Sequence, residues 1–288
     1  MSEESADQAR LMWTLFEPVH DVTYFTPEAR AAFEAAGLRG FWRGYFAGRA
    51  APFGPIGAAP VIAAFFNFAP GMVARAIPDV WDRAAPPRVL QARLTGAVAA
   101  LSRLADGQPP QALAETADLL EEAAGRLDHA GHVIGAANAA LPRPEEPLAR
   151  LWQAATVLRE HRGDGHVAAL VAADVGGCEV LAWRAASDLS REGLQPHRGW
   201  SDEEWDGATR RLVDRGWLDA GGKPTDTGVE SFRAIERATD VAAAGPWRAL
   251  GADRTQRLRE LLTPIASACF AELPPQMPVG LPAPGRVA

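Results

Sequence analysis

Apolar residues recur along most of the chain at the three- and four-residue spacing that one face of an α-helix requires. After Pro86-Pro87, apolar positions from Leu90 to Leu101 keep this spacing, and proline commonly opens a helix. The same pattern predicts helices over 110–124, over 148–160 and in two short stretches of 166–187, with a turn at RGDG (162–165) and a break at Gly176-Gly177. The chain is therefore expected to be mainly helical.

The segment LPRPEEP at residues 141–147 interrupts this pattern near the middle of the chain. Three prolines in seven residues are typical of a linker, so we expect one domain over residues 1–144 and another over 145–272. Residues 273–288 are rich in proline, and we expect this tail to dock loosely or to lack order.

Residues 201–244 have the order of elements of a winged helix-turn-helix. Ser201 and Glu204 form a capping box for a helix that ends before Gly216, a residue suited to the position after a helix. WLDAGGKPTDTG then predicts a short strand, a Gly-Gly turn and a return strand, before a helix that starts near Thr225. The expected fold class is all-α with a small β-wing, with an ordinary helix-hairpin-helix as the alternative.

A weak internal repeat connects the two halves. GYFAGRAAPFG (44–54) can be laid over GHVAALVAADV (165–175) without a gap, which places Tyr45 opposite His166. Four identities in eleven positions are also explained by chance. The N-terminal helical half could thus be a degenerate winged helix, packed on a winged-helix-like C-terminal half.

Five segments together resemble an actinobacterial family that is identified as helix-turn-helix or MarR-like. They cover nearly the whole chain: EPVHDVTYF (17–25), GYFAGRAAPFGP (44–55), FFNFAPGMVARAIPDVW (65–81), LREHRGDGHVAAL (158–170) and RGWLDAGGKPTDTGVE (215–230). The resemblance implies a helix-turn-helix fold and marks these positions. It implies no particular chemistry.

The charge of the chain argues against nucleic acid as the partner. The 288 residues hold 29 basic and 36 acidic side chains, and Lys223 is the only lysine. Residues 201–240, which include the candidate recognition helix, carry ten acids against six bases. A DNA-reading helix must neutralise phosphates, so DNA binding is the less favoured interpretation.

Arginine and aromatic residues gather in one stretch that lacks other charges. Between Ala35 and Pro78 there is no Asp, Glu or Lys, but four arginines, Trp42, Tyr45 and six Phe are present. A buried guanidinium needs an anion, which for Arg49 could be a protein carboxylate such as Glu17 or Asp164, or a ligand carboxylate or phosphate. We therefore predict a pocket for a ligand that carries an anionic group. The predicted ligand-binding residues are Arg49, Phe25, Trp42, Phe53, Phe66, Phe68 and Asp164.

The residues that could transfer protons are His20, Tyr24, Tyr45 and His166. The ordinary pKa of histidine suits proton transfer near neutral pH, and Tyr24 follows His20 by one helical turn. Asp164 is expected to cap a helix whose first turn holds His166. The alternative for His20 is a core histidine bonded to the backbone. Whether a bound ligand is turned over is left open.

Other chemistries lack their motifs in this sequence. The histidines do not match HExxH, so no metal site is predicted, although a haem with His20 or His166 as its axial ligand is kept as an alternative. GxSxG, GxxxxGK[ST] and GxGxxG are all absent. No signal peptide or membrane-spanning stretch is visible, and the isolated Cys178 and Cys269 fit a reduced cytoplasm.

Together these features predict a cytoplasmic small-molecule-binding protein, which could be an enzyme of specialised metabolism. A winged-helix scaffold would hold an aromatic or hydrophobic anionic ligand between its two halves. The alternatives are a MarR-type ligand-responsive transcriptional regulator and a haem-binding protein, and a homodimer is left open.

Overall fold

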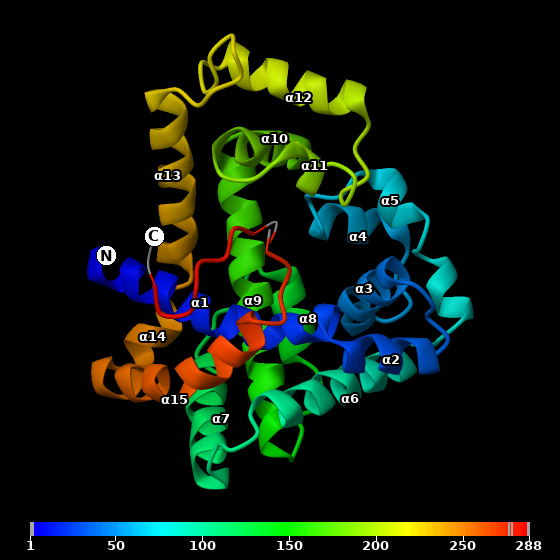
Figure 1. Ribbon diagram of the computed structural model, residues 1–288, viewed down its shortest axis with the longest axis vertical. Coiled ribbons are helices and arrows are strands. Elements are labelled where there is room, and N and C mark those ends of the chain that lie inside the picture. Colours follow the sequence, from blue (N-terminus) through cyan, green and yellow to red (C-terminus); the bar gives the residue numbers. More distant parts are fainter. Residues whose placement is uncertain (1–2, 276, 278, 287–288) are drawn as a thin grey trace.

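The computed structural model describes residues 3–275, 277 and 279–286, and the regular elements of these residues are helices (Figure 1). The long helix α9 (Pro147–Ala172) runs through the middle of the molecule. Helices α1 (Glu3–Phe25), α7 (Pro110–Ala124), α8 (Val133–Ala139) and α13 (Asp226–Ala242) all pack against it. The prediction of a mainly helical protein is confirmed.

The largest hydrophobic core surrounds the first half of α9. Its bulkiest fully buried side chains include Phe16, Trp152 and Trp247. The helices around this core, besides α1, α7 and α9, are α6 (Pro86–Leu104), α14 (Gly245–Leu250) and α15 (Ala252–Phe270). The segment 141–147 is the loop between α8 and α9, and the largest core takes side chains from helices on both sides of it. The division at residue 144 stays a prediction.

A second core lies beside α8 and holds most of the aromatic residues of the N-terminal half. Phe46, Phe65 and Phe68 are buried there; Phe46 stacks on Phe65 and meets Phe68 edge to face. Short helices surround this core: α2 (Pro27–Ala35), α3 (Phe41–Ala50), η1 (Ala51–Phe53), α4 (Ala58–Ala64), α5 (Pro70–Ala74) and η2 (Asp79–Asp82).

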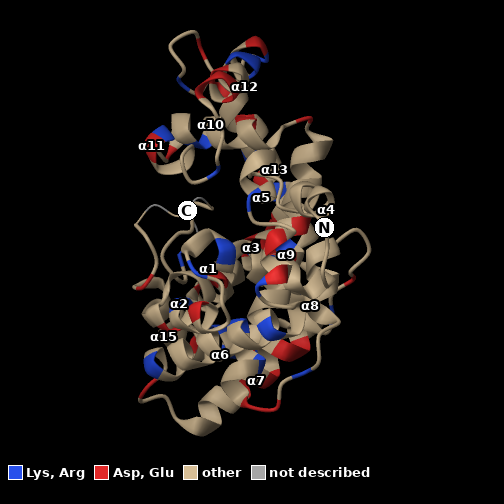
Figure 2. Cartoon of the chain, turned by 90° about the vertical axis from the view of Figure 1, so that its right-hand side faces the viewer, with Lys and Arg blue, Asp and Glu red and all other residues tan. Residues whose placement is uncertain are grey.

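A third core joins the end of α9 to the remaining helices, α10 (Gly177–Ser187), α11 (Arg191–Leu194) and α12 (Asp202–Asp214), and to α13. The rings of Trp183 and Phe232 stack here with their centroids 4.0 Å apart. Helix α12 lies at one end of the molecule, and its surface carries both acidic and basic side chains (Figure 2).

Several helix ends are where local sequence signals predict them. Ser201 and Glu204 form both hydrogen bonds of the capping box at the start of α12. Thr225 is the N-cap of α13, and its side chain accepts from the backbone N–H of Gly228. Gly216 has a φ of +71°, which is the left-handed conformation that glycine supplies after a helix.

The predicted β-wing is not supported. The described residues contain no strand, and the two arms of the turn meet in one isolated antiparallel bridge between Leu218 and Pro224. Asp219 closes the turn itself, because its side chain accepts from the backbone N–H groups of Gly221 and Lys223. The arms are therefore too short to form a ladder. The described part of the N-terminal half likewise shows no wing.

The predicted turn at RGDG (162–165) is also wrong, because α9 continues through it without a break. A Cβ on Gly165 would lie 3.4 Å from the ring of His132 and 3.6 Å from the side chain of Ala242. Both are ordinary van der Waals contact distances, so Gly165 lies on a packed surface of the helix and not in a turn. The predicted break near Gly176-Gly177 does separate α9 from α10.

The described part of the proline-rich tail crosses the face of α1 and α9 (Figure 1). Met277 and Leu281 are buried in the largest core, so this part is docked, while Pro278 lies outside the described residues.

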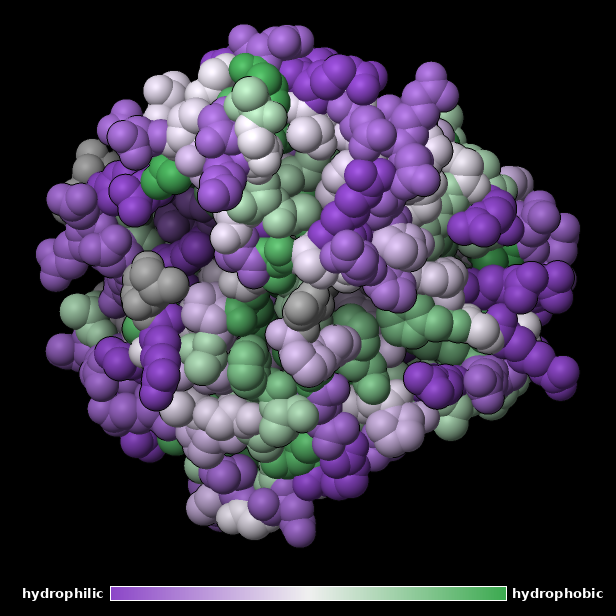
Figure 3. Space-filling model, turned by 45° about the horizontal axis from the view of Figure 1, so that its top comes forward, coloured by the Kyte–Doolittle hydropathy of each residue, from purple (hydrophilic) through white to green (hydrophobic). Residues whose placement is uncertain are grey.

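Charged and polar residues cover much of the face in Figure 3, with a band of apolar residues through its middle. Among the described residues, no single helix is long and apolar enough to cross a membrane; α9 and α10 reach that length and composition only together, with a bend of 96°.

Candidate functional site

Two adjoining cavities lie where the N-terminal helices meet α9, α10 and α13. We call the smaller one, of about 130 Å³, the arginine cavity, because Arg49, Arg159, Arg162, Arg184 and Arg198 line it. The larger one, of about 670 Å³, is the aromatic cavity, and its walls include Tyr24, Phe25, Phe41, Trp42 and Tyr45. Five residues line both cavities: Glu17, Tyr45, Arg159, Arg198 and Val279.

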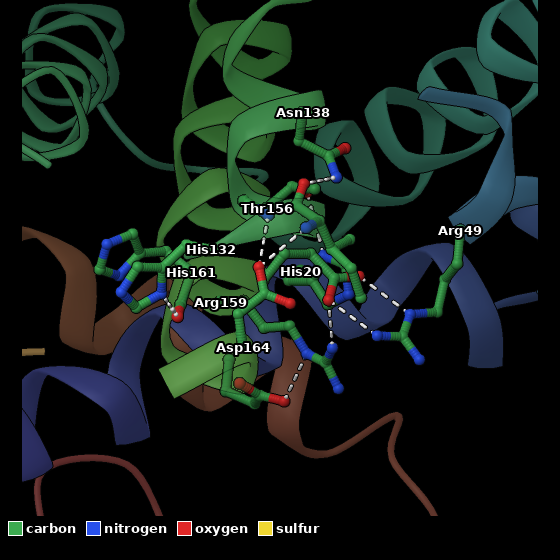
Figure 4. Close-up of polar contacts among 12 residues, drawn as sticks. His20, Arg49, His132, Asn138, Thr156, Arg159, His161 and Asp164 are labelled. Carbon is green, nitrogen blue, oxygen red and sulfur yellow. Dashed lines mark hydrogen bonds and ion pairs between the residues drawn. The ribbon is translucent and has the colours of Figure 1, made fainter. Parts of the chain in front are cut away.

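The arginine cavity contains a buried ion-pair network that starts at Arg49. Its Nε and Nη2 donate to the two carboxylate oxygens of Glu160 on α9, at 2.9 and 2.8 Å (Figure 4). Glu160 also accepts from Arg159 Nη1 at 2.6 Å, and Arg159 Nε donates to Glu17 at 3.1 Å. Arg49 therefore has a protein carboxylate as its partner, although neither Glu17 nor Asp164, the two expected candidates, is that residue.

The charges of this network reinforce one another. Burial alone would raise the pKa of Glu160, but Arg159 and Arg49 lower it far below its ordinary value. Glu160 in turn keeps the pKa of Arg49 above its ordinary value despite burial. Because two of its nitrogens bind Glu160, Arg49 cannot also clamp a ligand carboxylate with both. Its Nη1 donates to the hydroxyl of Tyr45 at 3.2 Å.

The five arginines differ in whether a carboxylate neutralises them. Beyond the Arg49 network, Arg162 pairs with Asp240 at 2.7 Å and Arg184 with Asp188 at 2.5 Å. Arg198 is the exception, because no carboxylate of the described residues lies within salt-bridge distance of it. Its Nη1 donates to the carbonyl oxygen of His197, and its buried Nε has no hydrogen-bond partner among the described residues.

Arg198 is held in place by the loop between α11 and α12. Its carbonyl oxygen accepts from the N–H of Ala69, and Trp200 donates from its indole to the carbonyl oxygen of Asn67. The guanidinium lies over the ring of Phe68, 4.5 Å from its centroid. Burial first, and then the charges of Arg49 and Arg159, lower the pKa of Arg198 to about 10, so it is a cation at neutral pH.

The aromatic cavity places several predicted residues together. The rings of Tyr24 and Tyr45 lie 4.8 Å apart, and Phe41 stacks between Phe25 and Tyr45. Trp42 meets Phe41 edge to face. Pro274, Pro275, Met277 and Val279 of the tail also line this cavity. This wall is suited to a planar or hydrophobic ligand.

His20 lies behind Tyr24 and does not line either cavity. Its Nδ1 is 3.0 Å from the hydroxyl of Thr156, and its Nε2 is 3.1 Å from the hydroxyl of Tyr24. Burial lowers the pKa of His20 well below its ordinary value, so the ring is neutral. The structure thus places His20 as a core histidine that orients Tyr24, without access to a ligand.

Two other predicted residues also lie outside both cavities. Asp164 sits in the middle of α9, and its carboxylate accepts from the N–H groups of Ile134 and Gly135, at 2.8 and 2.9 Å. It therefore caps α8, whereas the expected cap on a helix opened by His166 is wrong. Phe53 packs against the second core.

His166 does line the arginine cavity, together with Phe66 and Phe68. It projects from the middle of α9, and its Nδ1 is 3.0 Å from the hydroxyl of Thr239. Burial lowers the pKa of His166 to about 4, which leaves the ring neutral at pH 7. At neutral pH it offers the cavity a neutral imidazole, not a cation.

Four residues of the site were missed by reasoning from the sequence: Asp21, Arg159, Glu160 and Arg198. Arg159 and Glu160 lie within LREHRGDGH, a segment that carries the family resemblance but implies no chemistry for these two residues. Asp21 follows Glu17 by one helical turn, a spacing that could have indicated paired carboxylates. Arg198 stands in a loop without any local signal.

The described residues hold no group of three His, Cys, Asp or Glu that could bind a metal ion. The rings of His132 and His161 stack at 3.6 Å, and each ring has a nitrogen next to a backbone carbonyl oxygen (Figure 4). A haem does not fit at His20, because both ring nitrogens are engaged. A haem at His166 would have to bind through Nε2, because Nδ1 contacts the hydroxyl of Thr239. It would then have to lie in a cavity of only about 130 Å³.

Comparison with known protein families gives one match, to the model of a helix-turn-helix family, over residues 9–274. The chain belongs to this helix-turn-helix family. No curated protein matches it, and no solved structure does.

In this helix-turn-helix protein, α12 begins with acidic residues, and most of the basic residues near its end form ion pairs within the protein. Asp202 and Asp206 bind Arg191 of α11. Arg211 pairs with Glu179 at 2.6 Å, and Arg215 pairs with Asp174. Arg210 is exposed, and no ion pair of the described residues includes it. One of the two arginines of this helix, Arg211, and the C-cap residue Arg215 are thus already neutralised.

Proposed function

We propose that this protein binds an aromatic or hydrophobic small molecule that carries an anionic group, and that its helix-turn-helix half serves as part of the scaffold. The single observation that supports this function is Arg198, a half-buried cation in the wall shared by both cavities, with a buried Nε and no carboxylate partner among the described residues. The anionic group would bind Arg198, and the apolar body would occupy the aromatic cavity.

The energetic argument rests on the contrast with the other four arginines. A buried charge without a partner is costly, and each of the other arginines in the arginine cavity has a carboxylate within salt-bridge distance. A ligand carboxylate, sulfonate or phosphate would supply the missing partner of Arg198. Its Nε could then donate a charge-assisted hydrogen bond, which is stronger than a neutral one.

The size and walls of the aromatic cavity indicate the rest of the ligand. Ligand pockets of about 300–1,000 Å³ accommodate drug-sized molecules, and the cavity of about 670 Å³ lies within that range. Phe25, Phe41 and Trp42 offer ring faces and edges, and Pro274 and Pro275 add an apolar surface from the tail. A ligand with one to three fused or linked rings fits this description.

The proposal is tested with two fluorescent probes that differ by one group. 8-Anilinonaphthalene-1-sulfonate carries a sulfonate, whereas N-phenyl-1-naphthylamine has the same rings and no charge. We expect the wild-type protein to bind the sulfonate more tightly, because only the sulfonate can pair with Arg198. The variant Arg198→Gln should lose about tenfold or more in affinity for the sulfonate, equivalent to about 1.4 kcal/mol, and little for the uncharged probe.

Arg210→Gln is the matched control, since Arg210 is exposed on α12 and lines neither cavity. It should bind both probes like the wild type. Equal loss of both probes in Arg198→Gln would indicate a damaged fold, which a thermal melt of the same sample would detect. Unchanged sulfonate affinity in a folded Arg198→Gln would refute the proposed role.

A second candidate function is that of a MarR-type ligand-responsive regulator, and membership of the helix-turn-helix family favours it. The surface of α12 opposes it, because this helix begins with Asp202, Glu203 and Glu204. Near its end, Arg211 and the C-cap residue Arg215 are paired within the protein. A gel shift with the DNA upstream of the protein's own gene, at low salt, separates the two. A specific, salt-sensitive shift that disappears in Arg210→Gln would establish the regulator.

A further inference from the structure

Asp21 carries a buried carboxylate oxygen without a partner, in the wall of the aromatic cavity. The residue is 3% exposed, and its Oδ2 has no hydrogen-bond partner among the described residues. Glu17, one helical turn earlier, lines the same cavity, but its oxygens accept from Arg159 and from the indole N–H of Trp13. An unsatisfied buried polar atom is costly, so Asp21 indicates a group that a ligand could supply.

The charges around Asp21 determine which form of the carboxyl is present. Glu17 faces it from α1, Arg159 and Glu160 from α9, Arg49 from α3, and the thiol of Cys269 from α15. Burial has the largest effect and raises the pKa of Asp21 well above its ordinary value. Glu17 and Glu160 raise it further, whereas Arg159 and Arg49 lower it. The carboxyl therefore holds its proton at a higher pH than an exposed aspartate.

We propose that Asp21 is a second polar subsite of the aromatic cavity, where its carboxyl donates a hydrogen bond to an oxygen of the ligand. This inference rests on the proposed function, with the anionic group of the ligand at Arg198. It specifies the ligand class as an aromatic acid with a second oxygen, a ketone or a phenol, elsewhere on the ring system.

An oxygen acceptor fits this position better than a ligand amine. An ammonium group would need Asp21 in its ionised form next to Glu17, and Arg159 and Arg198 line the same cavity. A ketone oxygen needs only a donor, which the protonated carboxyl provides.

The test uses 2-naphthoate and its acetyl derivatives, with isothermal titration calorimetry as the readout. 2-Naphthoate carries the acid group alone, and isomers with an acetyl group at different positions of the second ring add one acceptor oxygen and no donor. In the wild-type protein we expect the best acetyl isomer to bind about tenfold more tightly than 2-naphthoate. Its aminomethyl analogue, which is a cation at that position, should bind more weakly than 2-naphthoate.

Two variants isolate the hydrogen bond. Asp21→Asn keeps a donor of the same shape and should retain the preference for the acetyl isomer. Asp21→Ala should lose the preference while it still binds 2-naphthoate. In the wild type the preference should shrink as the pH is raised and the carboxyl loses its proton, whereas in Asp21→Asn it should not change with pH. Thermal melts establish that both variants are folded.

Three results would overturn the inference, and they differ in what else they affect. Equal affinity of every acetyl isomer and 2-naphthoate would remove the Asp21 subsite but leave the proposed function intact. Preference for the aminomethyl compound, lost in Asp21→Asn, would make Asp21 an ionised site for a cation. Failure of 2-naphthoate to bind a folded wild-type protein would overturn both the subsite and the proposed function.

Discussion

The buried ion-pair network at Glu160 leads to a prediction about stability. Glu160 is 1% exposed and binds two arginines, Arg49 through both carboxylate oxygens and Arg159 through one. The variant Glu160→Ala removes the shared anion and leaves Arg49 with only the Tyr45 hydroxyl as a hydrogen-bond acceptor among the described residues. Arg159 keeps its contact with Glu17.

The expected cost follows from the loss of one partner of a buried ion pair, which is about 3–5 kcal/mol. The lower part of that range applies if Arg159 turns fully toward Glu17. If the free energy of unfolding falls by about 3 kcal/mol per molar urea, the midpoint of unfolding should shift down by about 1 M or more. Glu160→Gln keeps the shape and one acceptor oxygen, so its loss should be smaller.

The assay is urea unfolding followed by tryptophan fluorescence, with Glu115→Ala as the control. Glu115 also makes a two-pronged contact with an arginine, Arg257, but at the surface, and its loss should leave the midpoint almost unchanged. The reasoning would be refuted if Glu160→Ala moved the midpoint no further than Glu115→Ala. Acid should act in the same direction: the folded protein lowers the pKa of Glu160, so this contribution is present above the ordinary pKa of glutamate and is lost as the pH falls below it.

Further predictions concern three positions. Gly177→Ala would place a Cβ 2.0 Å from the carbonyl oxygen of Phe66, so we expect a loss of about 1–3 kcal/mol in urea unfolding, against no loss for Gly245→Ala, which has open space. Asp164→Ala removes the cap of α8 and should cost about 1 kcal/mol in the same assay, whereas Asp164→Asn, which keeps an acceptor oxygen, should cost less. Burial lowers the pKa of His166 to about 4, so the unfolded chain binds the proton more tightly than the folded protein, and the free energy of unfolding should fall as the pH drops from 6.5 to 4. His166→Gln should reduce this dependence on pH. An unchanged dependence on pH in His166→Gln would contradict the role of His166.

The features that the sequence predicts well are those that neighbouring residues determine. The capping box at Ser201 and the N-cap at Thr225 depend on side chains three residues from the groups they bind, so their signals are local. The RGDG segment was misassigned because its glycines match a turn equally well. Gly165 instead packs against His132 and Ala242, which are distant in the sequence and leave no local pattern.

The candidate site was located by composition and not by motif. The coincidence of arginine and aromatic residues between Ala35 and Pro78 indicates a pocket, and the structure places Trp42, Tyr45 and Arg49 around two cavities. The sequence does not identify the partner of Arg49, because Glu160 is 111 residues away from it. Arg198 becomes recognisable only once the other arginines have been matched with their carboxylates.

The central claim is that an anionic aromatic ligand binds at Arg198 with its rings in the aromatic cavity. A crystal structure of the protein with 8-anilinonaphthalene-1-sulfonate tests it most directly. The account predicts the sulfonate within hydrogen-bond distance of the Arg198 guanidinium and the rings against Phe25 and Trp42. A probe bound only on the outer surface, or one whose sulfonate points away from Arg198, would contradict it.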